Sequence, residues 1–523
     1  MSESTVENVR GRRHSTSVLD DRPIGDTADG AVGAPTYSWR RPTVPLLIVL
    51  GAVAIYSWYF TQRSLDIHHA LGTSTYDSAL YDQGMWLLSR FKAPFSTLMG
   101  RNLFGDHTSF VLFLLVPFYW LFPSAGIMFF AQSLAIGAGA IPVFLYGRRR
   151  LGSEWFAIVG AATYLLHPAV GWTNLENFHP DAFLGVFVGF AIYAALESKW
   201  RLYVVFVVLS LLVKEDVSLV IVPLGIWVAV KRDRRIGLLT IVGSVAFMIT
   251  AMYLVMRNLI GVPTRNGWRI PFGGPRGVID TAVTNPTQLS DYLSSEERPW
   301  YIWQMTAPFA WLFLRLPSVA AISALVLFTN ILSTFWYQHQ IEYHYSLIAV
   351  PALSIGTVYA IGAVREHVEW SGNVVPLRGV AVLVLAVATL VTATLWAPVP
   401  WGDQPQYYGD PNAAEAVAAR ELMAEIPGDA VVSAHYRITP QLAHREEIYQ
   451  FPTPFRVVLY GPDTSIEGSR LEDRAERVEY VMIPTAQDAQ LQADWAAIAP
   501  AFELVDSNDY WLLYHRNPAV PLP

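Results

Sequence analysis

Acidic side chains in the polar stretches between apolar segments are the residues best suited to acid–base chemistry. Asp77 and Asp82 lie in a long polar stretch, residues 61–107, that follows the first apolar segment. An aspartate at such a boundary can act as the general base that deprotonates an acceptor hydroxyl. Either aspartate can equally be a helix cap or a solvated loop acid, and the residues alone leave both roles open.

Asp106 and His107 end the same stretch and form a second candidate pair. An adjacent Asp and His can orient a proton shuttle or bind a divalent metal. Asp106 also directly precedes an apolar run, which makes it a candidate helix N-cap. We include both residues among the predicted catalytic groups, and a divalent metal, if the chain uses one, is expected at these two side chains.

Further charged and imidazole residues interrupt the later apolar segments, where they are costly unless they have partners or a function. Lys214 can pair with a phosphate or with its acidic neighbours. Arg269 lies in an Arg- and Gly-rich loop that can clamp a pyrophosphate or contact lipid head groups. The predicted substrate-binding residues are His179, Asp181, Lys214, Glu215, Asp216, Arg269, Glu342 and His344.

The elements that must position these residues are membrane helices. The chain has 523 residues, of which 53% are apolar and only 15% are charged, whereas soluble chains carry about 25% charged residues. Twelve apolar segments are expected, near residues 44–60, 109–123, 125–146, 154–170, 182–197, 201–213, 217–230, 236–256, 302–316, 318–335, 346–364 and 377–397. The sequence therefore predicts a mainly α, polytopic membrane bundle.

The basic residues predict how this bundle is oriented. Clusters at 148–150, 199–201 and 231–235, and the Arg40–Arg41 pair before the first segment, are expected to face the cytoplasm. The N-terminus is then cytoplasmic, and the loops 61–107 and 257–300 face outward, the first with one or two helices on the membrane surface. An outward C-terminus requires an odd number of crossings. We therefore expect eleven, with residues 109–146 containing a re-entrant or surface helix.

Three regions are expected along the chain. Residues 1–40 read as a disordered cytoplasmic tail, 41–400 as the multi-pass domain in the plasma membrane, and 401–523 as a small extracytoplasmic α/β domain. The last region carries 8 Arg, no Lys and 19 acidic residues, a balance that argues against nucleic acid. Cysteine is absent, which excludes disulfides and thiolate metal sites.

Several motifs together resemble a family of predicted membrane proteins catalogued as domain of unknown function 2079. They include Tyr81-Asp82-Gln83, Gly105-Asp106-His107, Phe178-His179-Pro180-Asp181, Lys214-Glu215-Asp216 and His344-Tyr345-Ser346. The layout is similar to the C-type (GT-C) glycosyltransferases, multi-spanning enzymes that use polyprenyl-phosphate sugar donors at the outer face. By that similarity Asp77 or Asp82 corresponds to the catalytic acid. The chain lacks the Lys-Pro-Pro stretch of the better-known branches in its first loop.

The leading expectation is a membrane glycosyltransferase that moves a sugar from a polyprenyl-phosphate donor to a cell-envelope acceptor. Its partners are then the bilayer, the lipid-linked sugar and the acceptor. A transporter or flippase for a lipid-linked or polar solute is an alternative. A non-catalytic envelope scaffold is a third.

Overall fold

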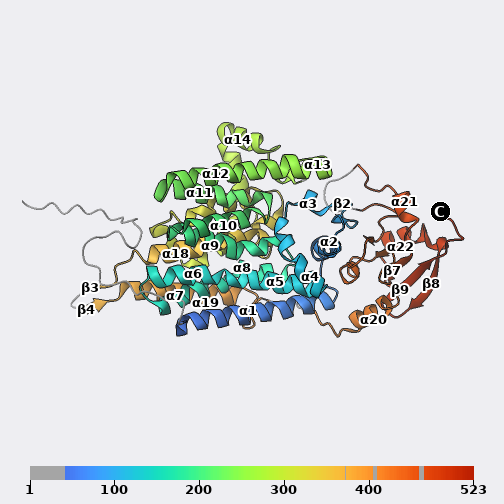
Figure 1. Ribbon diagram of the computed structural model, residues 1–523, viewed down its shortest axis with the longest axis horizontal. Coiled ribbons are helices and arrows are strands. Elements are labelled where there is room, and N and C mark those ends of the chain that lie inside the picture. Colours follow the sequence, from blue (N-terminus) through green and yellow to red (C-terminus); the bar gives the residue numbers. More distant parts are fainter. Residues whose placement is uncertain (1–41, 265, 371–372, 405–408, 459–464) are drawn as a thin grey trace, which may run out of the picture.

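A computed structural model describes residues 42–264, 266–370, 373–404, 409–458 and 465–523. A helical body occupies one end of the molecule and a C-terminal domain with a β-sheet occupies the other, as Figure 1 shows. The predicted disordered tail, residues 1–40, and the Arg40–Arg41 pair lie outside the described residues.

Helix α1 (Val44–His69) begins where the side chain of Thr43 accepts a hydrogen bond from the backbone N–H of Leu46 at 3.4 Å. Pro45 occupies the first turn, where its fixed φ and missing N–H cost nothing. The helix has 26 residues and a length of about 39 Å. It is therefore long enough to cross the hydrocarbon core of a bilayer, which is about 30 Å thick.

The helical body is built from many helices of unequal length. After α1 they are α4 (Val116–Leu121), α5 (Ala125–Ala138), α6 (Ala140–Arg150), α7 (Glu154–Leu165), α8 (Pro168–Leu175), α9 (Leu184–Leu196), α10 (Trp200–Leu211), α11 (Ser218–Lys231), α12 (Arg234–Ile249), α13 (Arg257–Ile260), α14 (Pro275–Thr284), α15 (Pro286–Ser294), α16 (Arg298–Thr306), α17 (Ala324–Leu332), α18 (Val350–Ile361) and α19 (Leu377–Trp396). A hairpin of β3 (Val368–Trp370) and β4 (Asn373–Val375) connects the last two.

Five helical stretches in the described part of the chain are long and apolar enough to cross a membrane. They are Val44–His69, Ala125–Arg150, Arg234–Ile260, His344–Ile361 and Leu377–Trp396. Three shorter apolar helices, Pro180–Leu196, Trp200–Leu211 and Ala320–Leu332, coincide with other expected segments. Residues 109–123 form only the 3₁₀ turn η2 (Phe110–Leu114) and the six-residue α4, which are too short to cross. The number of times that residues 109–146 cross the membrane stays a prediction.

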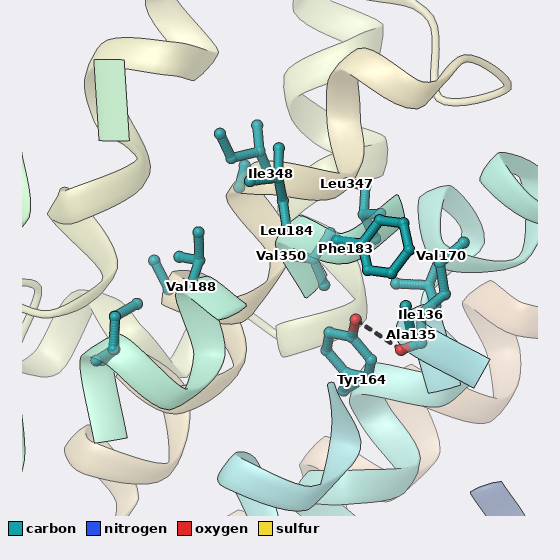
Figure 2. Packing of buried hydrophobic residues seen from close by; sticks show 14 of the residues in the cluster. Ala135, Ile136, Tyr164, Val170, Phe183, Leu184, Val188, Leu347, Ile348 and Val350 are labelled. Atoms are coloured by element: carbon teal, nitrogen blue, oxygen red, sulfur yellow. Dashed lines mark hydrogen bonds between the residues drawn. The ribbon is translucent and has the colours of Figure 1, made fainter. Parts of the chain in front are cut away.

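The core of the helical body depends on close contacts at glycine. Figure 2 shows the ring of Tyr164 between neighbouring helices, with its hydroxyl donating a hydrogen bond to the carbonyl of Ile136 at 3.0 Å. A Cβ atom at Gly139 would lie 2.2 Å from that hydroxyl oxygen, and one at Gly185 would lie 2.3 Å from it. Glycine at these two positions lets α6 and α9 approach the tyrosine, which is fully buried.

The C-terminal domain contains a five-stranded mixed sheet in the order β6-β5-β7-β9-β8. The strands are β5 (Val432–Ala434), β6 (Ile448–Gln450), β7 (Tyr480–Pro484), β8 (Phe502–Ser507) and β9 (Trp511–Arg516). The first three run parallel, and β9 pairs antiparallel with β7 and β8. Helices α20 (Ala414–Met423), α21 (Glu472–Ala475) and α22 (Ala489–Ala496) complete the predicted α/β domain.

The first polar loop is packed between the helical body and the C-terminal domain. Figure 1 shows its elements α2 (Leu80–Ser89), β2 (Arg101–Asn102) and α3 (Leu103–Asp106) there, and β1 (Phe95–Ser96) pairs with β2. Leu71, Ala79 and Leu98 belong to the hydrophobic core of the C-terminal domain. Gln83 is fully buried, and its amide donates to the backbone carbonyl of Arg445 at 3.4 Å. The C-terminal domain therefore braces this loop.

Candidate functional site

Polar residues from distant parts of the chain line one cavity of about 410 Å³. They come from the turn η1 (Thr75–Ala79), the end of α3, the loop between α8 and η3 (Pro180–Phe183), the residue before η4 (Glu215–Val217) and the start of η11 (His344–Ala349). Eight of the twelve predicted site residues are among the lining residues: Asp77, Asp106, His107, His179, Asp181, Lys214, Arg269 and His344.

Asn177 joins the first polar loop to the loop that carries His179. Its side-chain carbonyl accepts hydrogen bonds from the backbone N–H of Ser74 at 2.7 Å and from the hydroxyl of Ser78 at 3.1 Å. Asn177 has a positive φ of 68°, and Asn adopts this left-handed conformation more readily than most residues. These contacts hold η1, and with it Asp77, beside the second loop.

Gln132 of α5 holds the second loop from inside the helical body. Its amide donates to the carbonyl of Asn177 at 2.6 Å, and its side-chain oxygen accepts the backbone N–H of His179 at 2.9 Å. Gln132 is fully buried, so these hydrogen bonds are shielded from water. The position of His179 is therefore determined by a rigid membrane helix as well as by its own loop.

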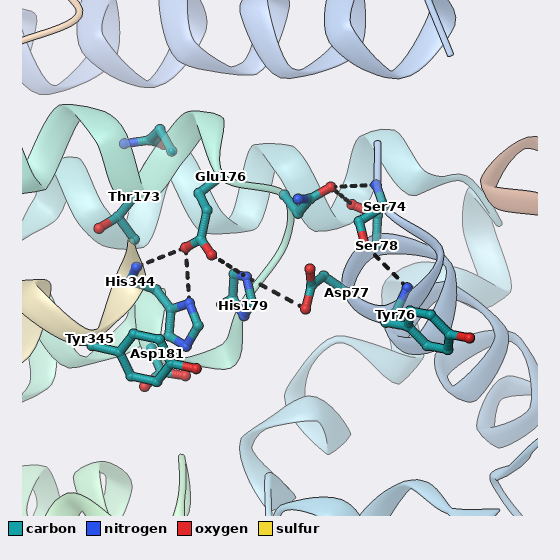
Figure 3. A network of polar contacts seen from close by, with 12 residues as sticks. Ser74, Tyr76, Asp77, Ser78, Thr173, Glu176, His179, Asp181, His344 and Tyr345 are labelled. Atoms are coloured by element: carbon teal, nitrogen blue, oxygen red, sulfur yellow. Dashed lines mark hydrogen bonds and ion pairs between the residues drawn. The ribbon is translucent and has the colours of Figure 1, made fainter. Parts of the chain in front are cut away.

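Glu176 contacts both rings of a stacked pair of imidazoles. Its Oε2 accepts hydrogen bonds from the backbone N–H of His344 at 2.7 Å and from that residue's Nδ1 at 2.9 Å. Its Oε1 lies 3.5 Å from Nε2 of His179, and the two rings stack with centroids 3.7 Å apart. Figure 3 shows Asp77 on the other side of His179, with Oδ1 at 4.0 Å from the same Nε2.

This arrangement shifts the ionisation of its members. Burial disfavours the charged imidazolium of His179, but Glu176 and Asp77 outweigh burial and raise the pKa of His179 to about 9. Burial also tends to raise the pKa of Glu176, yet the two imidazoles hold it well below its usual range. The pKa of Asp77 is raised, because burial outweighs the attraction of His179. A carboxylate with a raised pKa is a stronger proton acceptor.

Lys214 and Arg269 supply positive charge on another side of the cavity. Nζ of Lys214 lies 3.7 Å from carboxylate oxygens of both Asp181 and Asp216. These pairs outweigh burial and raise the pKa of Lys214 well above its usual value, so the ammonium stays charged. The guanidinium of Arg269 lies 4.2 Å from the ring centroid of Phe335 and donates to the hydroxyl of Tyr345 at 3.3 Å.

Arg269 differs from Lys214 in lacking an acidic partner. Among the residues that the structure describes, no carboxylate lies within 4.0 Å of its guanidinium, and its buried Nε has no hydrogen-bond partner. The Arg269 side chain is half-buried, and an anion beside it would complete the contacts of this Nε. The site is therefore prepared for an anionic group beside Arg269.

Asp106 and His107 line the cavity through existing ion pairs. Asp106 pairs with Nη2 of Arg101 at 2.5 Å, and it caps no following helix, because η2 begins at Phe110 without a side-chain cap. His107 Nδ1 contacts Oε1 of Glu215 at 2.7 Å. Burial lowers the pKa of His107, but Glu215 outweighs burial and raises it. Glu215 thus acts on the cavity indirectly, by holding His107.

Asp82 and Glu342 do not line this cavity. Oδ1 of Asp82 accepts hydrogen bonds from the hydroxyl of Tyr119 at 2.9 Å and from Nε2 of His444 at 2.8 Å. It faces a separate cavity of about 320 Å³ beside the C-terminal domain. Asp77 lies in η1, which is a π-helix, and Asp82 lies in the following α2. They therefore point to different sides of the first loop.

An apolar groove adjoins the polar cavity. It has a volume of about 560 Å³ and shares Asp181, Lys214, Arg269 and Tyr345 with the cavity, while Glu215 and Asp216 line it as well. Most of the remaining lining residues are apolar and come from α11, α12, η5 (Thr250–Met256), α14 and η11: Leu219, Met248, Met252, Val278, Ile279 and Ile348. The two cations therefore stand where a polar cavity opens onto an apolar groove.

The basic clusters lie at the other end of the helical body. His344, at the cavity, begins an 18-residue apolar helical stretch that ends at Ile361, and this stretch is about 27 Å long if regular. The guanidinium of Arg150 lies 4.8 Å from the ring of Tyr359, near that far end, and Arg378 donates to the carbonyl of Leu151 at 3.2 Å. The cavity and the arginine cluster are thus separated by the thickness of the body.

Several residues of the cavity were not among the predicted site residues. Glu176 precedes the predicted His179 in a polar stretch, and that dense polar stretch was the available signal. Three aromatic residues surround Arg269: Tyr345 belongs to the motif His344-Tyr345-Ser346, whereas Trp268 and Phe335 gave no signal. Aromatic residues are common throughout this chain, and their convergence on one guanidinium arises only in the folded structure.

Comparisons with known proteins agree with this architecture. A family model described as "Predicted membrane protein (DUF2079)" matches residues 67–520. The structure is similar to ArnT from Cupriavidus metallidurans bound to undecaprenyl phosphate (TM-score 0.51, 12% identity, covering 90% of this chain and 98% of that one). The apo state of that protein gives a TM-score of 0.50 at 13% identity, covering 91% and 99% of the two chains.

Arabinofuranosyltransferase AftD from Mycobacteria has a TM-score of 0.47 at 14% identity, covering 90% of this chain and 40% of that one. The sequence has no match among curated proteins. At these identities the likeness to ArnT concerns the fold alone. The expected fold class is confirmed: a mainly helical membrane body whose fold is similar to that of ArnT, with a small C-terminal α/β domain.

Proposed function

The chain belongs to the DUF2079 family of predicted membrane proteins, and we propose that it is a glycosyltransferase with a polyprenyl-phosphate sugar donor. One observation carries this proposal: Lys214 and Arg269 stand where the polar cavity meets the apolar groove. A lipid phosphate needs this combination, since its head group requires cations and its chain requires an apolar surface. The sugar then occupies the polar cavity.

The lipid assignment has two further supports. Arg269 has a buried Nε without a hydrogen-bond partner, which a phosphate oxygen would satisfy. ArnT, which shares the fold, was determined in complex with undecaprenyl phosphate. We therefore propose a polyprenyl phosphate as the carrier, with its chain along α11, η5 and α14.

Asp77 is the proposed general base, and Asp82 is not, because Asp82 faces a different cavity. The acceptor hydroxyl oxygen attacks the anomeric carbon of the donor, and Asp77 takes the hydroxyl proton. The bond between that carbon and the phosphate oxygen breaks, and its electron pair leaves with the phosphate. Lys214 and Arg269 stabilise the negative charge that accumulates on the departing phosphate.

We propose that this reaction takes place at the outer face of the plasma membrane. The arginine cluster near Arg150 lies at the opposite end of the body from the cavity. Because basic clusters favour the cytoplasmic side, the cavity and the C-terminal domain then face outward. An acceptor in the cell envelope would reach the cavity from that side.

The test uses Arg269→Ala with Arg276→Ala as its matched control. Arg276 lies in the first turn of α14, seven residues after Arg269, and its side chain is 93% exposed and contacts Asp280 at 3.9 Å. Binding of undecaprenyl phosphate to the purified protein is measured by native mass spectrometry in detergent. Loss of a charge-assisted hydrogen bond costs about 1.5–3 kcal/mol, so binding to Arg269→Ala should weaken by about 10- to 150-fold.

Arg276→Ala should bind undecaprenyl phosphate as the wild type does. Equal affinity of all three proteins would contradict the assignment of the phosphate to Arg269. Loss of binding in both variants would indicate a non-specific effect of removing loop charge, and it would also reject the assignment.

A further inference from the structure

Glu176, His179 and His344 form a group whose candidate ligand atoms all lie within 4.8 Å of one another. Two of the residues come from the loop after α8, and the third comes from η11, more than 160 positions later in the chain. Both imidazoles are buried, with exposed side-chain fractions of 5% for His179 and 7% for His344. Neither sequence motif suggested that these three side chains share one site.

The distances around His179 fit a shared metal ion better than they fit hydrogen bonds. Its Nε2 has no hydrogen-bond partner, and the nearest carboxylate oxygens are those of Glu176 at 3.5 Å and Asp77 at 4.0 Å. Two ligands that are each about 2.1 Å from a tetrahedral ion lie about 3.4 Å apart. The separation between Nε2 and Oε1 of Glu176 therefore matches that of two ligands of one ion.

The electrostatics of the site also favour a cation. The carboxylate oxygens of Glu176 and Asp77 flank the buried Nε2 of His179 at 3.5 Å and 4.0 Å, and two carboxylates at this point would attract a dication. The ligands are already held by other groups. Gln132 fixes the backbone of His179, and Glu176 accepts the backbone N–H of His344. Such supporting contacts orient ligands in known metal sites.

We propose that Glu176, His179 and His344 bind a divalent transition-metal ion, with zinc as the best fit. Two imidazoles and one carboxylate are a donor set typical of zinc, whereas magnesium and calcium prefer oxygen donors alone. Asp77 lies next to the remaining coordination position. The site differs from the pair Asp106 and His107, whose side chains are engaged by Arg101 and Glu215.

The experiment measures metal in the full-length protein, purified in detergent with a peptide tag that contains no histidine. Bound zinc is determined by inductively coupled plasma mass spectrometry after dialysis against dilute zinc. About one zinc per chain is expected for the wild type, and a loss of at least tenfold in occupancy is expected for His179→Ala. His515→Ala, in which an exposed histidine of the C-terminal domain is removed, should retain the wild-type value.

If His179→Ala does not fold, Glu176→Gln serves as a second variant, because it preserves the shape of the side chain. Glu176→Gln should also lose zinc. When zinc is replaced by cobalt, only the wild type and His515→Ala should show the intense visible absorption of a four-coordinate site. The proposal is overturned if the folded wild type binds no zinc, or if Glu176→Gln keeps full occupancy. Because metal content is measured without lipid or acceptor, its outcome is independent of the proposed transferase activity.

Discussion

Substituting Asp77 and Asp82 separately by Asn should separate catalysis from stability. The two carboxylates looked equivalent in the sequence, but Asp77 lines the main cavity while Asp82 accepts hydrogen bonds from Tyr119 and His444. We expect Asp77→Asn to fold normally and to lose transfer activity. We expect Asp82→Asn to be less stable and to keep its activity per folded molecule.

The magnitudes follow from the contacts. The Asp82 side chain is 5% exposed, and its two hydrogen bonds are made to a carboxylate. Asn replaces the charged acceptor by a neutral amide oxygen, which weakens each hydrogen bond by about 1 kcal/mol. Asp82→Asn should therefore lower the free energy of unfolding by about 2 kcal/mol. The Asp77 side chain is 36% exposed and 4.0 Å from His179, so its loss should cost less than about 1 kcal/mol. Loss of a general base should reduce transfer by about 10²- to 10⁴-fold.

Stability is measured by urea unfolding in detergent, and transfer is measured as release of polyprenyl phosphate from the lipid-linked sugars of native membranes. The reasoning would be refuted if Asp82→Asn abolished transfer at unchanged stability while Asp77→Asn remained active. Loss of activity in both variants at unchanged stability would show that the two aspartates act together, against their separation in the structure.

Three other predictions concern pH dependence, packing and orientation. Because Glu215 raises the pKa of His107, their pair stabilises the fold below the usual histidine pKa, and this stabilisation is lost as pH rises through the raised pKa. The free energy of unfolding should therefore fall with rising pH in the wild type, and it should fall less in His107→Gln. Gly185→Ala, which brings a methyl group against Tyr164, should cost about 1–3 kcal/mol in unfolding free energy, whereas Gly243→Ala, which meets open space, should not. The chain has no cysteine, so an introduced Asn266→Cys is the single site for a maleimide label. Because Asn266 lines the cavity, a membrane-impermeant maleimide should label it from the outer side alone. Labelling from the cytoplasmic side as well would favour a transporter.

The sequence predicted the membrane fold, the α/β domain and all but one of the charged and histidine residues that line the cavity, because each leaves a local signal. Apolar runs identify membrane helices, and charged residues between such runs stand out. What the sequence did not predict depends on long-range contacts. It could not choose between Asp77 and Asp82, since their directions depend on how η1 continues into α2.

Long-range contacts also explain why the packing of the first polar loop and two of the strands were not predicted. The loop was expected to carry one or two helices on the membrane surface, and that placement stays a prediction. Its packing against the C-terminal domain left no local signal, because Leu71 and Leu98 are buried among residues that lie far away in the sequence. In the sequence, residues 430–433, 456–459, 480–483 and 510–514 look like short strands. The sheet has strands near 430–433, 480–483 and 510–514, and it also contains Ile448–Gln450 and Phe502–Ser507. Residues 456–458 form no strand, and residue 459 lies outside the described residues.

The central claim, that a polyprenyl phosphate binds with its head at Lys214 and Arg269, is tested most directly by photo-crosslinking. The probe is a polyprenyl phosphate with a diazirine in its first isoprene units, and the modified peptides are identified by mass spectrometry. We predict crosslinks on η5 and α14, at or next to Met252 and Ile279, that are displaced by unlabelled undecaprenyl phosphate. Displaceable crosslinks found only outside the groove would contradict the account.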